Sequence, residues 1–504
     1  MSFTSILDLK EVITTDAVRD VFFTDLNLTQ IIDTVSAVWG EDVTNFYRYF
    51  PLDFECEQYR REVFTDLCVP DTFAAFLKFY RSMQDMDRAL SDREKVHTNL
   101  QRNIRLINAI FFYCDALSTL SNAIKSFSLS SPGLNAFKEA LDLYCSTDEF
   151  KELYEVSSSV ADSLGAFELS LVYDNNRVFL QSTEPSESVS DSFEDKLRRL
   201  YPDNEEPFKS PFMSTPELEG FERDVITLLM KKSPAVFKKI SSLKSRHEDF
   251  SNSTFIRFYK EIGFYLSFIS FVNSMKEKGF SFAIPTVNED KRIEAAGLYD
   301  LSLAILNSRR SLPVIDNDFY YDKDELFYVL TGPNQGGKTT FARSLGQLVF
   351  FTKMGLCVPA VRANLHYFNS IMTHFSVEES LETGRGKLME ELIRLKPMMT
   401  ASDVNSFVII NELFTTAANY DACIMGTKVL KHFTQSGCHG IYVTHLSELL
   451  KNEEHAVGLC AALDENGIQT YKILRSIMEY ETVASRIIDK YELSYEQLKE
   501  RLSS

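Results

Sequence analysis

A glycine-rich stretch at residues 332–339 constrains this chain more than any other feature of its sequence. It follows an apolar run at residues 326–331 and precedes a helix-like segment at 340–349. In the spacing G-x-x-x-x-G-K-[ST], backbone N–H groups close around a phosphate, and the following helix N-terminus favours negative charge. We therefore predict a strand, a phosphate-binding loop and a helix. The loop residues are Gly332, Pro333, Asn334, Gln335, Gly336, Gly337, Lys338 and Thr339, followed by Thr340.

Two further apolar runs place this loop in a parallel sheet. Residues 407–410 and 441–443 lack polar alternation, as strands do when helices bury both faces of a sheet. Asn411 and Glu412 follow the first of these runs directly. They should therefore lie at the carboxyl end of a strand, where such sheets bind ligands.

The first part of the chain has a helical pattern instead. Residues 71–131 contain neither Gly nor Pro and repeat apolar residues at steps of three and four, with a break expected near Asp92. Residues 167–180 alternate around a turn and predict a β-hairpin, which a proline-rich loop follows up to residue 216. The expected fold is thus α plus α/β. A long-helix core and lever region with a reduced, clamp-like hairpin and loop around 166–216 fills residues 1–285, and a P-loop domain with a mostly parallel sheet fills 286–504.

Charge limits the possible partners. Lys and Arg number 53 against 72 Asp and Glu, so the net charge is −19 and any contact with a polyanion must be a local patch. The best candidate for DNA contact is the acid-free run at 231–246, although a solvated helix face would have the same composition. Its cations are Lys231, Lys232, Lys238, Lys239, Lys244 and Arg246.

The sequence predicts a cytoplasmic protein without a membrane segment. No run of about 18 apolar residues occurs, and the N-terminus lacks the basic start and long apolar core of a secretory signal. The eight cysteines are scattered and form no C-x-x-C pair, so we expect reduced thiols.

Several motifs together resemble one family. Residues 331–340 read T-G-P-N-Q-G-G-K-T-T and closely resemble the T-G-P-N-M-G-G-K-S-T box of the MutS family of DNA mismatch-repair ATPases. Residues 355–360 resemble its G-x-x-V-P-A, residues 409–412 stand where its apolar-Asp-Glu motif lies, and residues 443–445 resemble its A-T-H. The resemblance is strong over about residues 316–502, including a final strand and a helical tail that dimerises in the family.

The resemblance implies a homodimer with two composite ATP sites, above which lever arms embrace DNA. Lys338 and Thr339 would hold phosphate and Mg²⁺, and Asn334 would lie beside the γ-phosphate. Glu412 would activate water, and His445 would sense the γ-phosphate. Such a site catalyses phosphoryl transfer mainly by positioning and charge neutralisation.

Two departures from the family pattern concern hydrolysis. Asn411 replaces the family's Asp; it can accept a hydrogen bond from Mg²⁺-bound water but adds no negative charge, so weaker Mg²⁺ retention and slow hydrolysis are expected. The segment that reaches the partner's γ-phosphate in the family reads Gly384, Arg385, Gly386, Lys387, Leu388 here and has no hydroxyl at the Ser position. Arg385 or Lys387 could supply charge in trans, or Lys387 could simply begin a solvated helix.

We expect no mismatch-reading or connector domain, because about 285 residues before the P-loop domain leave no room for them beside a core and levers. Phe-x-Glu occurs at 137–139 and 150–152, outside the expected context, and we interpret both matches as chance.

The leading hypothesis is an ATPase that couples nucleotide binding and hydrolysis at a dimer interface to DNA binding. The alternative is an ATP-gated clamp or scaffold that hardly hydrolyses ATP and grips a protein or a branched nucleic acid. A transporter-related P-loop ATPase is disfavoured, because no L-S-G-G-Q-like segment is present.

Overall fold

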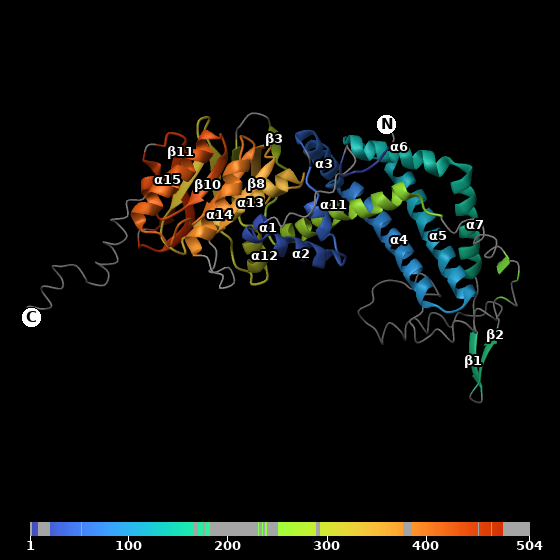
Figure 1. Ribbon diagram of the computed structural model, residues 1–504. Coiled ribbons are helices and arrows are strands. Elements are labelled where there is room, and N and C mark those ends of the chain that lie inside the picture. Colours follow the sequence, from blue (N-terminus) through green and yellow to red (C-terminus); the bar gives the residue numbers. More distant parts are fainter. Residues whose placement is uncertain are drawn as a thin grey trace, which may run out of the picture. The chain divides into compact units, whose positions relative to one another are not determined.

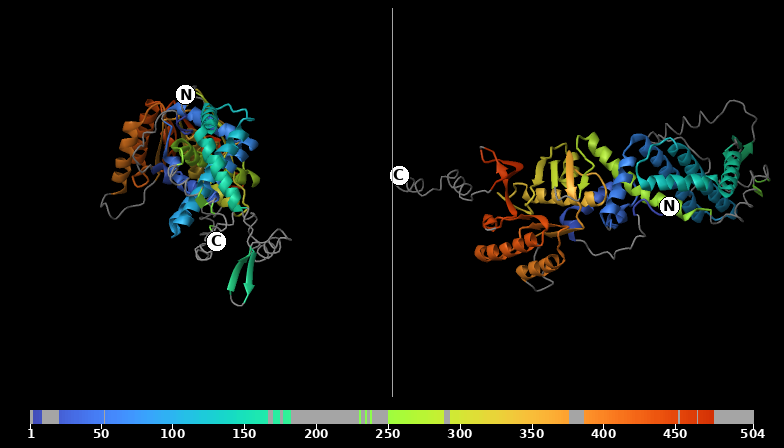
Figure 2. Two further views of the ribbon diagram at one scale, coloured as in Figure 1. Left: turned by 90° about the vertical axis from the view of Figure 1, so that its right-hand side faces the viewer. Right: turned by 90° about the horizontal axis from the view of Figure 1, so that it is seen from above.

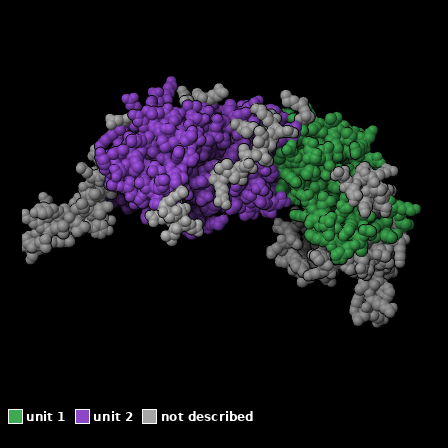
Figure 3. All heavy atoms as spheres, viewed as in Figure 1, with its two compact units in different colours: residues 1–3, 69–129, 134–262 green, residues 4–68, 130–133, 263–504 purple. Residues whose placement is uncertain are grey.

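The computed structural model describes residues 3–8, 21–51, 53–165, 170–174, 177–181, 230, 234, 237–238, 250–288, 293–375, 386–451, 453–464 and 466–476. The chain divides into two compact units, coloured separately in Figure 3. Unit 1 comprises Met1–Phe3, Val69–Leu129 and Leu134–Ile262; unit 2 comprises Thr4–Cys68, Ser130–Gly133 and Gly263–Ser504. The boundary predicted between residues 285 and 286 separates two types of fold, whereas the two units are defined by compactness. That boundary stays a prediction.

Unit 1 is built from long helices (Figure 1). The helices α4 (Pro70–Lys95) and α5 (Asn99–Ile124) pack against each other, and α7 (Asp148–Gly165) packs on α5. The helix α6 (Pro132–Ser146) and the start of α11 (Ser253–Glu277) share an aromatic core, in which the rings of Phe137 and Phe258 stack 3.4 Å apart. Phe137 and Phe150 are both buried, so the two Phe-x-Glu matches place their phenylalanines in the core.

The break in the first helical region comes later than predicted. The helix α4 continues past Asp92, which pairs with Lys95 at 2.9 Å, and ends at Val96 in extended conformation. Thr98 then caps α5, since its hydroxyl accepts a hydrogen bond from the Gln101 amide at 3.2 Å. The break therefore lies at residues 96–98, a few residues beyond the position predicted near Asp92, because Thr98 rather than Ser91 is the cap.

The predicted hairpin is present. The strands β1 (Ser170–Asp174) and β2 (Arg177–Gln181) pair antiparallel, with Asp174 opposite Arg177 across the turn. The loop predicted up to residue 216 lies outside the described residues.

The central sheet of unit 2 has six strands among the described residues, in the order β12-β11-β6-β10-β9-β8. The strands β11, β6, β10, β9 and β8 run parallel, and β12 is antiparallel at the edge. The three apolar runs became β6, β9 and β10, all fully buried, which confirms the reading of their composition. The bounds are β6 (Phe327–Thr331), β8 (Ser370–Phe375), β9 (Ser406–Asn411), β10 (His439–Val443), β11 (Ala456–Leu463) and β12 (Gln469–Arg475).

Helices cover both faces of this sheet (Figures 1 and 2). On one face, alternate residues such as Val329 and Ile410 pack in a cluster with the helices α14 (Lys387–Ala401) and α15 (Asn419–Gln435). On the other face lies α13 (Lys338–Lys353), which follows the glycine-rich loop and contacts Ile409. Helix η3 (Ser447–Leu450) follows β10.

Unit 2 contains a second sheet, which the sequence pattern did not predict. Three of its strands precede the glycine-rich loop in the sequence, and one follows it. Among the described residues it has four strands in the order β3-β7-β4-β5. Its strands are short and polar at alternate positions, so their sequence carries a weak signal. The bounds are β3 (Thr286–Asn288), β4 (Ile293–Leu298), β5 (Asn317–Tyr321) and β7 (Arg362–His366), with α12 (Leu301–Ser308) between β4 and β5.

The first N-terminal helix of unit 2 packs on α13, where the rings of Phe22 and Phe23 lie 6.3 and 5.6 Å from the ring of Phe350, and further helices follow it in the chain. In order, these helices are α1 (Val21–Asp25), α2 (Leu28–Trp39), η1 (Thr44–Arg48) and α3 (Phe54–Leu67). The buried Gln347 amide nitrogen donates to the Leu26 carbonyl at 3.0 Å and to the Asp300 carboxylate at 3.1 Å, while its oxygen accepts from the Leu301 amide at 2.8 Å. One side chain of α13 therefore joins segments more than 270 residues apart.

In the part of the chain that the structure describes, no helix has the length and apolar character needed to cross a membrane.

Gly346 provides a test of this packing. A Cβ added there would lie 2.5 Å from the Leu26 side chain and 2.8 Å from Ile409, so Gly346→Ala should lower the free energy of unfolding by about 1–3 kcal/mol through overpacking. Leu26→Ala makes room, so the double variant should lose less stability than the sum of the two single changes. Urea denaturation measures these differences. The control Gly386→Ala meets no atom within 4 Å and should change stability little; strict additivity would contradict the packing account.

Candidate functional site

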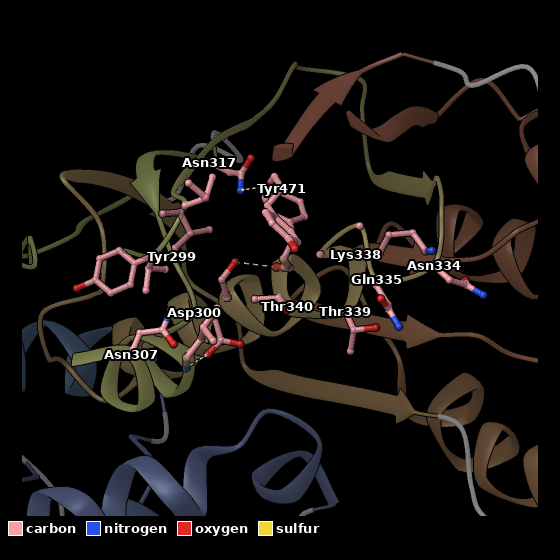
Figure 4. A pocket seen from close by; sticks show the side chains of 18 of the residues that line it. Tyr299, Asp300, Asn307, Asn317, Asn334, Gln335, Lys338, Thr339, Thr340 and Tyr471 are labelled. Atoms are coloured by element: carbon pink, nitrogen blue, oxygen red, sulfur yellow. Dashed lines mark hydrogen bonds between the residues drawn. The ribbon is translucent and has the colours of Figure 1, made fainter. Parts of the chain in front are cut away.

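A cavity of about 810 Å³ opens at the glycine-rich loop (Figure 4). The loop and the start of α13 form one wall, and Glu412 and His445 from the ends of β9 and β10 lie at the same cavity. The opposite wall comes from α12, residues 313–317 and Tyr471. The predicted residues that line it are Asn334, Gln335, Gly336, Gly337, Lys338, Thr339, Thr340, Glu412 and His445.

The loop needs glycine at two positions. Gly332 has φ 131° and Gly337 has φ 87°, values at which a side chain is strained. A Cβ on Gly332 would also lie 2.9 Å from the Ala461 side chain of β11, so the neighbouring strand packs against the loop backbone. Gly337 caps α13, and the first residues of this helix, Lys338 to Thr340, line the cavity, so the helix N-terminus favours an anion there.

Lys338 is the cation of the cavity. Its Nζ donates to the carbonyls of Gly332 and Pro333, each at 2.9 Å, and the residue is buried. Burial lowers the pKa of Lys338, and the charge of Glu412 opposes that shift. A partly desolvated ammonium inside a glycine-rich loop provides strong compensation for phosphate charge.

The ends of β9 and β10 bring the hydrolytic candidates together. Glu412 follows β9, its backbone amide donates to the Val443 carbonyl at 2.9 Å, and its φ is 55°. The His445 Nε2 lies 3.4 Å from the Glu412 Oε1. Both side chains are about one-third exposed, so they face the open part of the cavity and can reach water.

Thr339 and Asn411 form the oxygen pair on which a magnesium ion would depend. The Thr339 hydroxyl donates to the Asn411 Oδ1 at 3.2 Å, and Asn411 is buried. Both ligand atoms are neutral oxygens of the kind that Mg²⁺ accepts directly or through water, beside the carboxylate of Glu412. These residues fit a hydrated magnesium ion that also binds nucleotide phosphates, but they supply less negative charge than an Asp would.

Tyr471 is a cavity residue that motif reasoning missed as a ligand contact. It lies in β12 with φ 59°, its carbonyl accepts from the Asn317 side chain at 3.3 Å, and its ring lies against Gly337. Figure 4 shows it at the cavity between Asn317 and Lys338. An exposed aromatic residue in an edge strand was the available signal, but sequence alone did not indicate that β12 passes the loop.

Other predicted residues are not part of this cavity. Gly384 and Arg385 lie outside the described residues, and Lys387 begins α14, where its Nζ donates to the Thr415 hydroxyl at 3.3 Å. Of the basic run, Lys238 is described and exposed. Its other cations, Lys231, Lys232, Lys239, Lys244 and Arg246, lie outside the described residues.

Comparison with known proteins shows similarity to one family around this site. The family model of MutS domain V matches residues 328–486, a range that contains the loop, β9, β10 and β12. A DNA mismatch repair protein MutS from Thermotoga sp. (strain RQ2) is 24% identical over 365 residues, covering 70% of this chain and 44% of that protein. One from Shouchella clausii is 22% identical over 419 residues, covering 79% of this chain and 46% of that protein.

A third relative, the DNA mismatch repair protein MutS of Acetivibrio thermocellus, is 28% identical over 204 residues, or 39% of this chain. The chain spans less than half the length of each of these relatives. The matched range contains nearly all of the six-stranded sheet and the part of the cavity formed by the glycine-rich loop, Glu412, His445 and Tyr471. Residues 328–486 therefore match domain V of the MutS family, and the similarity to MutS proteins extends over 70% and 79% of the chain in the first two of these relatives.

Proposed function

We propose that this protein binds ATP in the cavity at the glycine-rich loop. The observation that carries the proposal is the buried Lys338 inside a loop whose glycines hold backbone conformations suited to surrounding a phosphate. The α13 N-terminus adds a favourable field for the β- and γ-phosphates. The match to MutS domain V supports the same ligand.

The far wall suits a nucleobase. Pro313, Val314, Ile315 and Tyr471 give it an apolar, partly aromatic surface. The polar side chain of Asn317 is engaged with β12, since it donates to the Tyr471 carbonyl and accepts from the Ile473 amide at 2.7 Å. The base is therefore held mainly by stacking and apolar contact, and Tyr471 provides the ring.

For hydrolysis, Glu412 is the general base and His445 orients it or contacts the γ-phosphate. Both lie at the open end of the cavity, within 3.4 Å of each other. Thr339 and Asn411 would hold a magnesium ion, which supplies charge neutralisation on the β- and γ-phosphates when bound. The chain's own contribution is to fix these groups on the ends of adjacent buried strands.

The first test addresses binding. Lys338→Ala should weaken ATP binding at least about tenfold, because a charge-assisted contact in a partly desolvated site is lost. Isothermal titration calorimetry of the full chain with ATP measures the dissociation constant. Lys353→Ala is no suitable control, since Lys353 is buried in the core; the exposed Lys323→Ala, in the loop between β5 and β6, is, and it should bind as the parent does. Equal affinity in the Lys338 variant would refute the site.

The nucleotide site is completed, we infer, by a second copy of the chain. Exposed apolar side chains gather on the outer faces of α14 and α15: Met389, Leu392, Ile393, Tyr420 and Ile424. Helices with such faces are typical of protein interfaces. Their nearness in the chain to the motif at 384–388 favours a homodimer in which this motif approaches the partner's nucleotide, with Gly384, Arg385 and Lys387 as the contact residues.

A second function, an ATP-gated clamp that hardly hydrolyses ATP, is favoured by one observation. The Thr339 hydroxyl faces a neutral Asn411 where the family has a carboxylate. Magnesium would be held less tightly, and turnover would be slow although binding persists.

Substitution at Asn411 discriminates between the two functions. If the site is a slow ATPase limited by charge, Asn411→Asp should raise kcat about tenfold or more and lower the Mg²⁺ concentration needed for half-maximal rate. Steady-state ATPase assays over a Mg²⁺ series measure both quantities. Glu412→Gln in the same background should abolish the gain while ATP binding persists. A variant that is no faster at any Mg²⁺ concentration favours the clamp.

We further propose that ATP binding is coupled to DNA through the basic run at residues 231–246. The mismatch-repair relatives motivate this partner, and the local excess of cations offers phosphate contacts that the net charge of −19 otherwise disfavours. Such contacts would position the backbone without reading its sequence.

Charge reversal tests the DNA contact. Lys238→Glu with Lys239→Glu should weaken duplex binding for all sequences and flatten the slope of log K against log[salt] by about 0.9 per lost phosphate contact. Fluorescence anisotropy at several salt concentrations measures this slope. Lys323→Glu with Lys451→Glu, at exposed positions outside α14 and α15, makes the same change in net charge away from the run and should leave the slope unchanged. If both double variants gave identical slopes, the run at residues 231–246 would be only a solvated helix face without a role in DNA binding.

A further inference from the structure

We propose that Glu391 is a positioning residue that holds the turn carrying Glu412 and so couples helix α14 to the hydrolytic end of the cavity. The catalytic consequence rests on the proposed ATPase function, whereas the hydrogen bond itself does not. Glu391 neither lines the cavity nor occurs among the motif residues identified from the sequence. It acts through the backbone of the turn that follows Glu412.

The contact is a buried carboxylate on a backbone amide. The Glu391 Oε2 accepts from the Phe414 amide at 3.1 Å, and the residue has no exposed surface. Its other oxygen, Oε1, is buried without a hydrogen-bond partner. Burial raises the pKa of Glu391, and the bond from Phe414 opposes that shift. A carboxylate with one orphan oxygen is a poor choice for stability alone, which favours a role in geometry.

The turn that Glu391 holds is strained. Glu412 has φ 55° and Phe414 has φ 63°, and both are non-glycine residues in the left-handed region. Such conformations persist where surrounding contacts fix them. One bond fixes each end of the turn: the Glu412 amide donates to the Val443 carbonyl at 2.9 Å, and the Phe414 amide donates to Glu391.

A second contact joins the same helix to the same turn. The Lys387 Nζ donates to the Thr415 hydroxyl at 3.3 Å. Lys387 and Glu391 are four residues apart, so they lie on one face of α14. The other face of α14 exposes Met389, Leu392 and Ile393. Pressure on that exposed face, by a second copy of the chain, would move α14 and with it the turn that aims Glu412.

The experiment separates the effect of the Glu391 hydrogen bond from the effects of the volume and charge of its side chain. Glu391→Leu keeps the volume and removes the acceptor, whereas Glu391→Gln keeps an acceptor oxygen and removes the charge. With Glu391→Leu, we expect amide exchange of the 412–416 peptide to speed up about tenfold and kcat to fall about ten- to a hundredfold. The dissociation constant and KM for ATP should stay within about twofold, because the loop and Lys338 are untouched. Glu391→Gln should restore both exchange and kcat to near the parent values.

Glu390→Gln is the matched control, since it removes an adjacent acid from the same helix and should change neither quantity. Unaltered ATP binding shows that the Leu variant is folded. Parent-like exchange and kcat in Glu391→Leu would overturn the proposal, and so would a Gln variant as defective as the Leu variant. If the parent itself does not turn over ATP, the ATPase function fails; the exchange measurement still decides whether Glu391 holds the turn.

Discussion

The hydrogen-bond ladder between β6, β10 and β9 is the constraint on which the site depends. In the parallel register Val443 lies opposite both Leu330 and Asn411, so the three strands end at the same level. Backbone bonds continue beyond the strands, from the Glu412 amide to Val443 and from the Thr444 amide to Leu330, at 2.9 and 3.0 Å. The glycine-rich loop, Glu412 and His445 thus inherit their spacing from the sheet, and the fully buried strands make that spacing rigid.

Helix α13 extends this constraint to distant parts of unit 2. Its first residue is Lys338 at the cavity, and two turns later Gly346 and Gln347 meet Leu26 and the start of α12. The absence of a side chain at Gly346 permits the approach of Leu26, and the Gln347 amide satisfies backbone groups that burial would leave unpaired. A displacement of α13 on nucleotide binding would therefore reach the N-terminal helices without an intervening flexible segment.

Features with local physical causes could be read from the sequence, and features with long-range causes could not. The loop at 332–339, the buried strands and the hairpin at 170–181 follow from glycine spacing and hydrophobic period, and the structure contains all three. Both Ser91 and Thr98 have cap chemistry, so the sequence did not decide the position of the break between α4 and α5, and the contact between Tyr471 and the loop depends on the pairing of β12 with β11. Neither is encoded in a local window. The roles assigned to Gly384, Arg385 and the basic run stay predictions.

The turn after β9 shows how a helix outside the cavity can affect the proposed hydrolysis. Two non-glycine residues in left-handed conformation cost about 1–2 kcal/mol each, so the turn at 412–414 would relax unless other contacts fix it. The side chains of Leu413 and Phe414 are buried in the core cluster with α14 and α15, while β10 and Glu391 each fix one amide of the turn. Because the strain and its restraints come from different elements, the orientation of Glu412 depends on the sheet and on α14 together. Helix α14 contacts the turn and also carries an exposed apolar face. It is therefore placed to make the proposed hydrolysis depend on association with a second copy of the chain.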